Sequence, residues 1–160
     1  MLPVVTVGIK AAPIEGTPMA DEIEKPPRIP PRIKAAPIIR NVYYCDFWKD
    51  AQLPEFWKTR PVIVVSYKNT LIGPCTVIPL STGPQEGNPW AHKLSVMVDG
   101  ERQSWAVCNY PMTVAVSRLS QIKGKVPRVP QKDFDAILAL LLKWLPKLPQ
   151  PQPTENKDVS

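Results

Sequence analysis

The segment from residue 55 to residue 61 carries residue types that could bind a phosphodiester. It places the carboxylate of Glu55 and the cations of Lys58 and Arg60 in a loop just before an apolar run of strand length. An arginine can bind a phosphate through two parallel hydrogen bonds. An ordinary solvent-exposed loop could have the same composition, so both interpretations stay open. Aromatic side chains that could stack on unpaired bases lie in or after this segment, namely Phe56, Trp57 and Trp90.

A second segment supplies hydroxyl groups. Ser81 and Thr82 directly follow the apolar run 76–80, where a strand is expected to end. Hydroxyls can donate hydrogen bonds to the oxygens of a phosphate that an arginine neutralises. The two segments together are therefore candidates for one phosphate-binding site.

Most familiar enzyme signatures are absent from the sequence. It contains no glycine-rich phosphate loop, no nucleophile elbow and no HExxH pattern. The single histidine, His92, excludes RNA cleavage by a pair of histidines within one chain. Cys45, Cys75 and Cys108 are widely spaced in apolar surroundings, which favours buried reduced thiols over a zinc site. We therefore expect neither a metal nor a cofactor.

The elements that must position these residues are mostly strands. Short runs rich in β-branched and aromatic residues are separated by turn residues, which predicts a small antiparallel barrel or sandwich. One helix is expected to begin near Asp133, because apolar residues recur from there at three- and four-residue steps until Pro146 ends it. The expected strands are residues 42–48, 61–66, 76–80, 93–98, 104–108 and 112–116.

Proline divides the chain into three parts. Eight of the 21 prolines lie in residues 1–40 and four lie close to the C-terminus. This distribution predicts a proline-rich flexible arm at 1–40, a folded domain at 41–146 and a disordered tail at 147–160. The hexapeptide Ile-Lys-Ala-Ala-Pro-Ile occurs twice, at 9–14 and 33–38, as part of a semi-rigid spacer or as a docking peptide.

The charge of the chain favours a polyanionic partner. Twenty Lys and Arg against 14 Asp and Glu give a formal net charge of +6, most of it on the predicted domain. No apolar stretch approaches the roughly 20 residues that span a bilayer, and the N-terminus does not have the pattern of a secretory signal. We expect a cytoplasmic protein without a membrane partner.

Four segments, in the same order as in the family, resemble the MazF/PemK toxins, the ribonuclease components of toxin–antitoxin pairs. Residues 58–66 resemble the family signature RPV(V/L)V(V/L)S, and residues 78–83 match the strand end VPxT(T/S). Residues 108–119 resemble CDQ(P/I)RT(I/V)DxxRL, and a Lys-Gly-Lys-Val segment at 123–126 precedes the terminal helix. The resemblance covers residues 42–146.

This resemblance implies a fold and an activity. The fold would be an SH3-like β-barrel of the CcdB/MazF type with a C-terminal helix, assembled as a homodimer. The activity would be metal-independent cleavage of single-stranded RNA at short sequences, blocked by a cognate antitoxin. In that reaction the ribose 2′-hydroxyl attacks the adjacent phosphate and leaves a 2′,3′-cyclic phosphate and a 5′-hydroxyl end.

The resemblance also assigns roles to individual residues. Arg60 matches the family arginine and would stabilise the phosphate. Ser81 stands where the family usually has threonine, and either it or the following Thr82 could bind the scissile phosphate. Glu55 matches a loop glutamate that could serve as the base or contact RNA. His92 lies where some members carry a substrate-contacting histidine, although a structural histidine on an edge strand is the alternative.

The chain departs from part of the family at one strand. Some members carry an arginine and an aspartate on either side of the cysteine that corresponds to Cys108, whereas this sequence has Val107 and Asn109. Catalysis would then depend on Arg60, Ser81, Thr82 and Glu55. The alternative is a weak or inactive member that binds RNA or protein, and gyrase poisoning of the CcdB type is a more distant one. The residues expected to contact RNA are Trp57, Lys58, His92, Asn109 and Tyr110.

Overall fold

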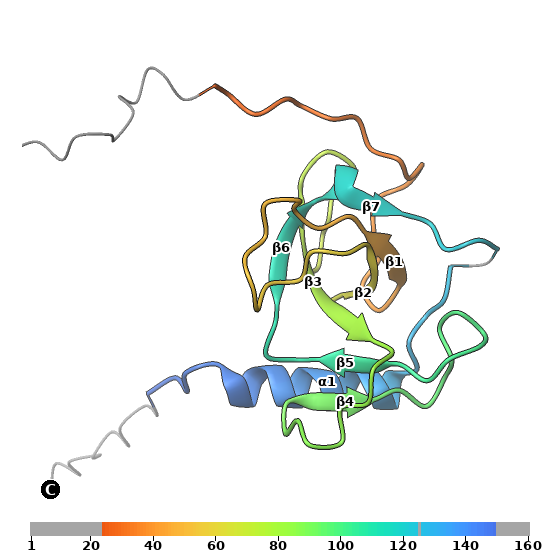
Figure 1. Cartoon of the computed structure of the whole chain (residues 1–160), viewed down its shortest axis with the longest axis vertical. Helices are drawn as coiled ribbons and strands as arrows, with labels where there is room; N and C mark the ends of the chain where they lie inside the picture. Colours follow the sequence, from red (N-terminus) through yellow and green to blue (C-terminus); the bar gives the residue numbers. More distant parts are fainter. Residues whose placement is uncertain (1–23, 125, 150–160) are drawn as a thin grey trace, which may run out of the picture.

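The computed structural model describes residues 24–124 and 126–149 (Figure 1). Within them, seven antiparallel strands form one sheet, and a single long helix follows near the C-terminus. The mainly β fold with a C-terminal helix is therefore confirmed. The strands are β1 (Val42–Cys45), β2 (Arg60–Val64), β3 (Pro74–Ser81), β4 (Ala91–Lys93), β5 (Trp105–Val107), β6 (Met112–Ala115) and β7 (Leu119–Ser120); a 3-10 turn spans Val116–Arg118 and the helix α1 spans Gln131–Trp144.

The longest strand, β3, organises the sheet. One of its edges pairs with β2, and the other is shared by β6 along its first half and β5 along its last two residues. The strand order is β4-β5-β3-β2-β1-β7, with β6 as the additional partner of β3. A strand that pairs with two others in succession along one edge curls the sheet, which gives the barrel-like arrangement in Figure 1.

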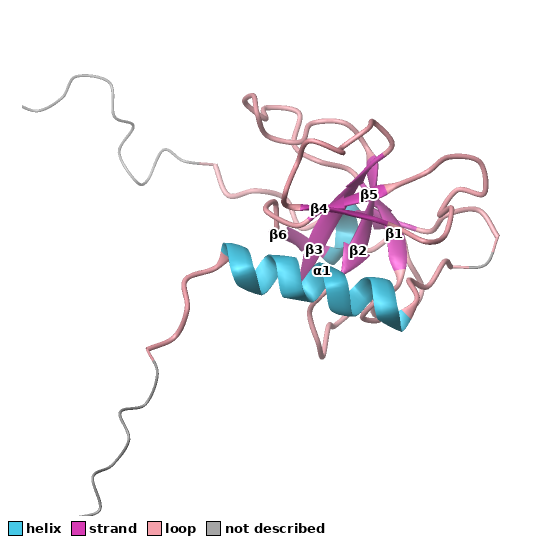
Figure 2. Cartoon of the chain, turned by 90° about the horizontal axis from the view of Figure 1, so that it is seen from below, coloured by secondary structure: helices cyan, strands magenta, loops and turns pink. Residues whose placement is uncertain are grey.

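Both faces of the central strands are buried. Val62 and Val64 of β2 belong to one apolar cluster, whereas Ile63 between them belongs to a second cluster with Phe134 and Ile137 of α1. A strand covered on both faces has a continuous apolar sequence instead of an alternating one. This explains why residues 61–65 could be recognised as a strand. In Figure 2, α1 lies along one side of the sheet, where Phe134 and Ile137 pack in the second cluster.

The strand predicted at residues 93–98 is wrong. The structure has β4 at Ala91–Lys93, and residues 95–98 form bends instead of a strand. The reason lies at Ser95, whose backbone N–H and hydroxyl both donate to the carboxylate of Asp133 in α1. A backbone amide that bonds to a helix side chain cannot extend a strand ladder, so the chain leaves the sheet there.

Residues 31–40, which the sequence analysis assigned to the flexible arm, lie against the barrel. Ile33 is 4% exposed and belongs to the same apolar cluster as Val62, and Pro37 is also buried. The amide nitrogen Nδ2 of Asn69 donates to the carbonyl of Pro37 at 3.1 Å. The second hexapeptide copy is thus a docked segment, while the copy at 9–14 lies outside the described residues, as does the tail from residue 150.

Hydrogen bonds of Arg40 hold the end of this docked segment in place. Its φ of +72° lies in the left-handed region that non-glycine residues rarely adopt. Two of its guanidinium nitrogens donate to the carbonyl of Val129 at 3.0 and 2.8 Å, and its own carbonyl accepts from the backbone N–H of Val129. These bonds hold the unusual backbone conformation and connect the start of β1 to the segment just before α1.

Candidate functional site

Arg60 lies at the centre of the candidate site. It is the first residue of β2, and its guanidinium carbon lies 5.0 Å from the ring centroid of Phe56. The Phe56 ring in turn meets Tyr110 edge to face at 5.2 Å. Among the described residues Arg60 forms no ion pair, and its Nε is buried without a hydrogen-bond partner. A partly buried guanidinium with unused donors is suited to an anionic ligand.

The pocket at Arg60 has a volume of about 380 Å³, and we call it the arginine pocket. Three cations and one carboxylate line it, which gives a formal charge of 3 − 1 = +2. Lys58 and Thr82, both predicted from the sequence, lie in it together with Arg60. The arrangement therefore favours a phosphate group over a neutral ligand. Its lining residues are Tyr44, Lys58, Thr59, Arg60, Pro61, Leu80, Thr82, Asp99 and Arg102.

Ser81 lies close to Arg60 because of the register between β2 and β3. Val62 pairs with Pro79, and the same register continued by two residues puts Ser81 opposite Arg60. The Ser81 side chain is nearly buried, and its Oγ accepts a hydrogen bond from the backbone N–H of Gly83 at 3.2 Å. Its hydroxyl proton stays available for another acceptor. Thr82 is exposed and lines the arginine pocket directly.

Asp99 and Arg102 are two pocket residues that the sequence analysis missed. The Asp99 carboxylate accepts from the backbone N–H groups of Arg102 at 2.9 Å and of Glu101 at 3.1 Å, and from Arg102 Nε at 3.3 Å. The Arg102 amide contributes most to holding the pKa of Asp99 below its usual range. The Asp-Gly pair at residue 99 indicated a turn, but nothing local indicated that this turn faces Arg60.

Glu55 is not brought into the arginine pocket. Its carboxylate accepts a hydrogen bond from the backbone N–H of Gln52 at 2.8 Å and so closes a turn within the loop between β1 and β2. Trp57 is 52% exposed and lines a neighbouring pocket instead. The ammonium of Lys58 lies 4.5 Å from the Trp57 ring centroid. Lys58 lines the arginine pocket, so its side chain lies between this pocket and the neighbouring one that Trp57 lines.

Asn109 and Tyr110 follow β5 at the same end of the barrel. The Oδ1 atom of Asn109 is buried without a hydrogen-bond partner among the described residues. Tyr110 packs on the Phe56 ring, and the Arg60 guanidinium lies over the same ring. The Arg60 guanidinium thus lies beside an aromatic pair, and Asn109 is the residue just before one member of that pair.

His92 is bonded to the helix instead of the arginine pocket. Its Nε2 lies 2.9 Å from Oδ1 of Asp133, and the other carboxylate oxygen, Oδ2, accepts from Ser95. Burial raises the pKa of Asp133, but the hydrogen bonds from Ser95 and His92 outweigh burial and lower the pKa below its usual value. Trp90 is nearby, stacked edge to face on Trp144 at 5.2 Å. The His92 side chain thus connects β4 to α1, and Trp90, the residue just before β4, makes a second contact with this helix.

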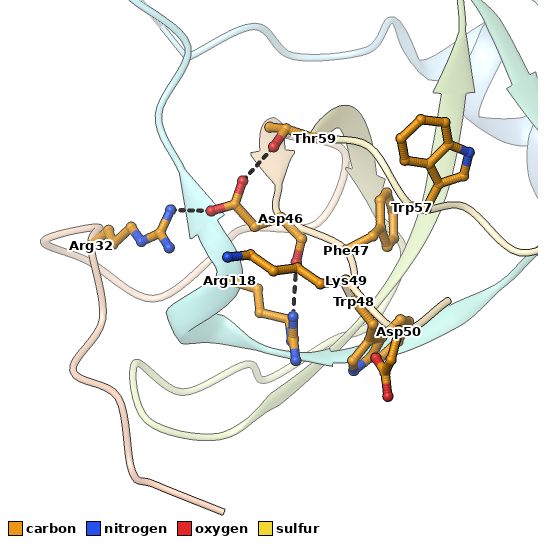
Figure 3. A pocket seen from close by; sticks show the side chains of 9 residues that line it. All are labelled: Arg32, Asp46, Phe47, Trp48, Lys49, Asp50, Trp57, Thr59 and Arg118. Atoms are coloured by element: carbon orange, nitrogen blue, oxygen red, sulfur yellow. Dashed lines mark hydrogen bonds and ion pairs between the residues drawn. The ribbon is translucent and has the colours of Figure 1, made fainter. Parts of the chain in front are cut away.

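A second pocket lies on the other side of Thr59 and has a volume of about 520 Å³ (Figure 3). We call it the tryptophan pocket. Asp46 lies at its centre, where it accepts from the hydroxyl of Thr59 at 2.6 Å and pairs with Arg32. These two hydrogen bonds, from Thr59 first and then from Arg32, lower the pKa of Asp46. The lining residues are Arg32, Asp46, Phe47, Trp48, Lys49, Asp50, Trp57, Thr59 and Arg118.

The three cysteines are free and buried, as the sequence predicted. Burial raises the pKa of Cys45 and of Cys108 to about 12, so both are neutral thiols at physiological pH. No group of three or more potential ligands lies close enough to hold a metal ion within the described residues. No helix in the described part of the chain is both long and apolar enough to cross a membrane.

Several solved structures have a similar fold. An endoribonuclease from a mycobacterial species, solved in complex with its cognate antitoxin, aligns with a TM-score of 0.51 at 19% identity, over 72% of this chain and 100% of that one. MazF from Deinococcus radiodurans aligns at 0.54 and 13% identity, over 69% of this chain and 96% of its own. The Mycobacterium tuberculosis toxin MazF-mt6 aligns at 0.50 and 16%, over 66% and 95%.

At these identities the likeness concerns the fold, and it confirms the MazF-like barrel with its C-terminal helix. A comparison with curated protein sequences gave no match. A family model, in contrast, matches residues 40–145, which include both strands that carry Arg60 and Ser81 as well as α1. The chain therefore belongs to the PemK-like, MazF-like toxins of type II toxin–antitoxin systems.

Proposed function

We propose that the protein is the toxin of such a pair and that it cleaves single-stranded RNA in the arginine pocket without a metal ion. The observation that carries this proposal is the Arg60 guanidinium, which has no ion-pair partner among the residues that the structure describes and has a buried Nε, in a pocket that also holds Lys58, Arg102 and Thr82. These groups match the charge and hydrogen-bonding needs of a phosphodiester.

The reaction would be attack of a ribose 2′-oxygen on the adjacent phosphorus, with loss of the 5′-oxygen of the next nucleotide. Negative charge grows on the two non-bridging oxygens during this step, so fixed donors there lower the barrier. Arg60 and Arg102 would stabilise that charge. Ser81 and Thr82 would donate to the phosphate, and the 5′-oxygen would take up a proton as it leaves.

Two carboxylates are candidates for accepting the 2′-hydroxyl proton. Asp99 is the one carboxylate that lines the arginine pocket, whereas Glu55 is hydrogen-bonded within its own loop. The lowered pKa keeps Asp99 ionised at neutral pH but makes it a weak base, which predicts slow cleavage. Asp99→Asn and Glu55→Gln separate the two: we expect the larger loss of cleavage rate in Asp99→Asn.

Aromatic residues beside the pocket support single-stranded RNA as the substrate. Phe56, Trp57 and Tyr110 border Arg60 and Lys58, and Trp57 is half exposed. Flat rings next to cations bind unpaired bases by stacking, while a duplex keeps its bases turned inward.

The test is incubation of the full chain with a long single-stranded RNA in EDTA, with the new ends mapped by primer extension. We expect discrete cuts that carry 5′-hydroxyl ends. Arg60→Ala should lose at least about 100-fold in rate, as expected for removal of a main transition-state donor. Arg128→Ala, a change at an exposed arginine outside the arginine pocket, is the matched control and should cleave normally.

The presence of Val107 and Asn109 favours one alternative, a member of the family that binds RNA but does not cut it. Intact RNA that is nevertheless retarded on a gel by wild type and released by Arg60→Ala would support this alternative. RNA that is neither cut nor bound would contradict both functions.

The proposed protein partners are a cognate antitoxin and a second copy of the chain, all in the cytoplasm. The mycobacterial endoribonuclease of similar fold was solved with its antitoxin. Apolar side chains at and beyond the end of α1 are exposed and form a surface suited to a protein partner. They are Leu142, Trp144, Leu145 and Leu148. Light scattering of the purified chain tests the dimer directly.

A further inference from the structure

We infer that the tryptophan pocket is a second nucleotide subsite of the proposed RNA groove and that Arg32, which precedes the family domain, binds RNA there. The inference deepens the proposed function and rests on it. The family model begins at residue 40, so Arg32 lies before the residues that it matches. The structure nevertheless brings Arg32 to the edge of the candidate site (Figure 3).

The position of Arg32 is fixed by its neighbours in sequence. The next residue, Ile33, is buried in an apolar cluster, and Pro37 is held by the side chain of Asn69. Asn69 is itself oriented, since its Nδ2 also donates to the carbonyl of Ser66 at 2.9 Å. An arginine next to such an anchor loses less conformational freedom on binding a ligand than one on a free tail.

The Arg32 guanidinium keeps donors for a ligand. It pairs with Asp46 through a single nitrogen, Nη1, and its side chain is still 51% exposed. A guanidinium has five N–H donors, so one contact with a carboxylate leaves most of them unused. Arg32 can therefore bind a phosphate while Asp46 orients it.

The remaining lining of the pocket suits a nucleotide. Arg118 holds the Trp48 ring, with its guanidinium carbon 5.0 Å from the ring centroid and its Nη1 bonded to the Asp46 carbonyl at 3.1 Å. Trp57 offers a half-exposed ring, and Lys49 adds a cation. Three cations against two carboxylates leave a formal charge of 3 − 2 = +1. Aromatic rings beside cations are the usual partners of unpaired nucleotides.

Thr59 connects the two pockets. It lines both of them, its hydroxyl donates to Asp46 in the tryptophan pocket, and the next residue in the chain is Arg60. An RNA strand whose scissile phosphate lies at Arg60 can pass Thr59 and put a flanking nucleotide against Trp57, with its phosphate at Arg32. The pocket is thus placed to add affinity for one side of the cut.

The experiment measures binding of a fluorescein-labelled single-stranded RNA with 2′-O-methyl groups, which cannot be cleaved, by anisotropy at several salt concentrations. The proteins are the full-length wild type, Arg32→Ala and Arg28→Ala. Arg28 is a matched control, because it is an exposed arginine of the same segment but lines a different groove. We expect Arg32→Ala to weaken binding about three- to tenfold and to lower the salt slope by about one, as for a lost phosphate contact.

A second variant makes the result independent of the docked segment. Trp57→Ala should weaken binding about tenfold through loss of stacking, and the fold should tolerate this change because the Trp57 side chain is half exposed. Equal affinities of Arg32→Ala and Arg28→Ala in a wild-type protein that binds RNA would overturn this inference alone. Failure of the wild type to bind RNA would overturn the proposed function and the inference with it.

Discussion

Asp133 shows how a single buried carboxylate ties a strand, a loop and the helix together. It is 5% exposed and accepts hydrogen bonds from Ser95 twice and from His92 once. Its pKa in the folded protein is below the value of 3.8 expected in the unfolded chain. A lowered pKa in the folded state means that the ionised carboxylate stabilises the fold above the unfolded pKa and that this contribution is lost as the pH falls.

Asp133→Ala should therefore destabilise the protein by about 1–3 kcal/mol at pH 7, the usual cost of leaving buried hydrogen-bonding groups without a partner. The cost should shrink as the pH falls below 3.8, because the carboxylate of the unfolded chain then takes up a proton before the folded one does. Urea unfolding at pH 7 and at pH 3.5 measures both effects. Asp135→Ala, at an exposed position on the same helix, should change little at either pH. A pH-independent cost for Asp133→Ala would contradict the assigned role of the charge.

Individual site residues were predictable where a local pattern marked them. Arg60 and Ser81 lie at the ends of apolar strands, so their neighbouring residues identified them, and the strand register brings them together. Asp99 and Arg102 could not be found this way, because the turn that carries them reaches the pocket only through the path of the loop after β4. For His92 the sequence left a substrate contact and a structural role on an edge strand open, and no local signal pointed to its bond with Asp133, 41 residues later.

At the scale of elements, α1 stabilises the fold through one face only. Ile137 is fully buried in the cluster shared with β2, whereas Leu142 is 66% exposed. Ile137→Ala should cost about 2–5 kcal/mol, since it leaves a cavity in addition to the lost apolar burial. Leu142→Ala should stay within about 0.5 kcal/mol when the protein is monomeric. Equilibrium urea unfolding at low protein concentration compares them, and equal costs would disprove the packing described for α1.

Whether an element could be predicted depended on where its backbone hydrogen bonds go. The segments 61–66 and 76–80 pair on both sides and bury both faces, so their apolar runs marked β2 and β3 correctly. The alternating residues 93–98 also predicted a strand. The backbone N–H of Ser95, however, donates to Asp133 of α1, and the strand ends before it. The two-residue strand β7 and the preceding 3-10 turn are too short to leave a pattern.

At the scale of the whole molecule, the docked segment before β1 is part of the folded unit. Deletion of residues 1–40 should lower the melting temperature clearly relative to deletion of residues 1–30. The longer deletion removes Ile33 and Pro37 from their buried positions and leaves Asp46 without Arg32. Loss of a buried isoleucine alone costs about 2–5 kcal/mol. Identical melting curves of the two truncated proteins would mean that the segment contributes nothing to stability.

The proline distribution predicted a folded domain at 41–146, but it did not predict that the segment before this domain docks on the barrel. Prolines recur through residues 24–40, and no helix or strand occurs among these residues. The proline spacing could not reveal that Ile33 and Pro37 are buried, because two apolar contacts in an extended segment leave no periodic pattern. The repeated hexapeptide was the one available signal, and its second copy is the segment that docks.

In the proposed function, the site around Arg60 cleaves RNA by attack of a 2′-hydroxyl. The most direct measurement uses two short oligonucleotides that span a mapped cut, one all-RNA and one with a single 2′-deoxy nucleotide just before the scissile phosphate, both in EDTA. We predict that wild type cleaves the RNA to a 2′,3′-cyclic phosphate and leaves the deoxy oligonucleotide intact, while Arg60→Ala cleaves neither. Cleavage of the deoxy oligonucleotide at the same bond, or an undiminished rate with Arg60→Ala, would contradict the account.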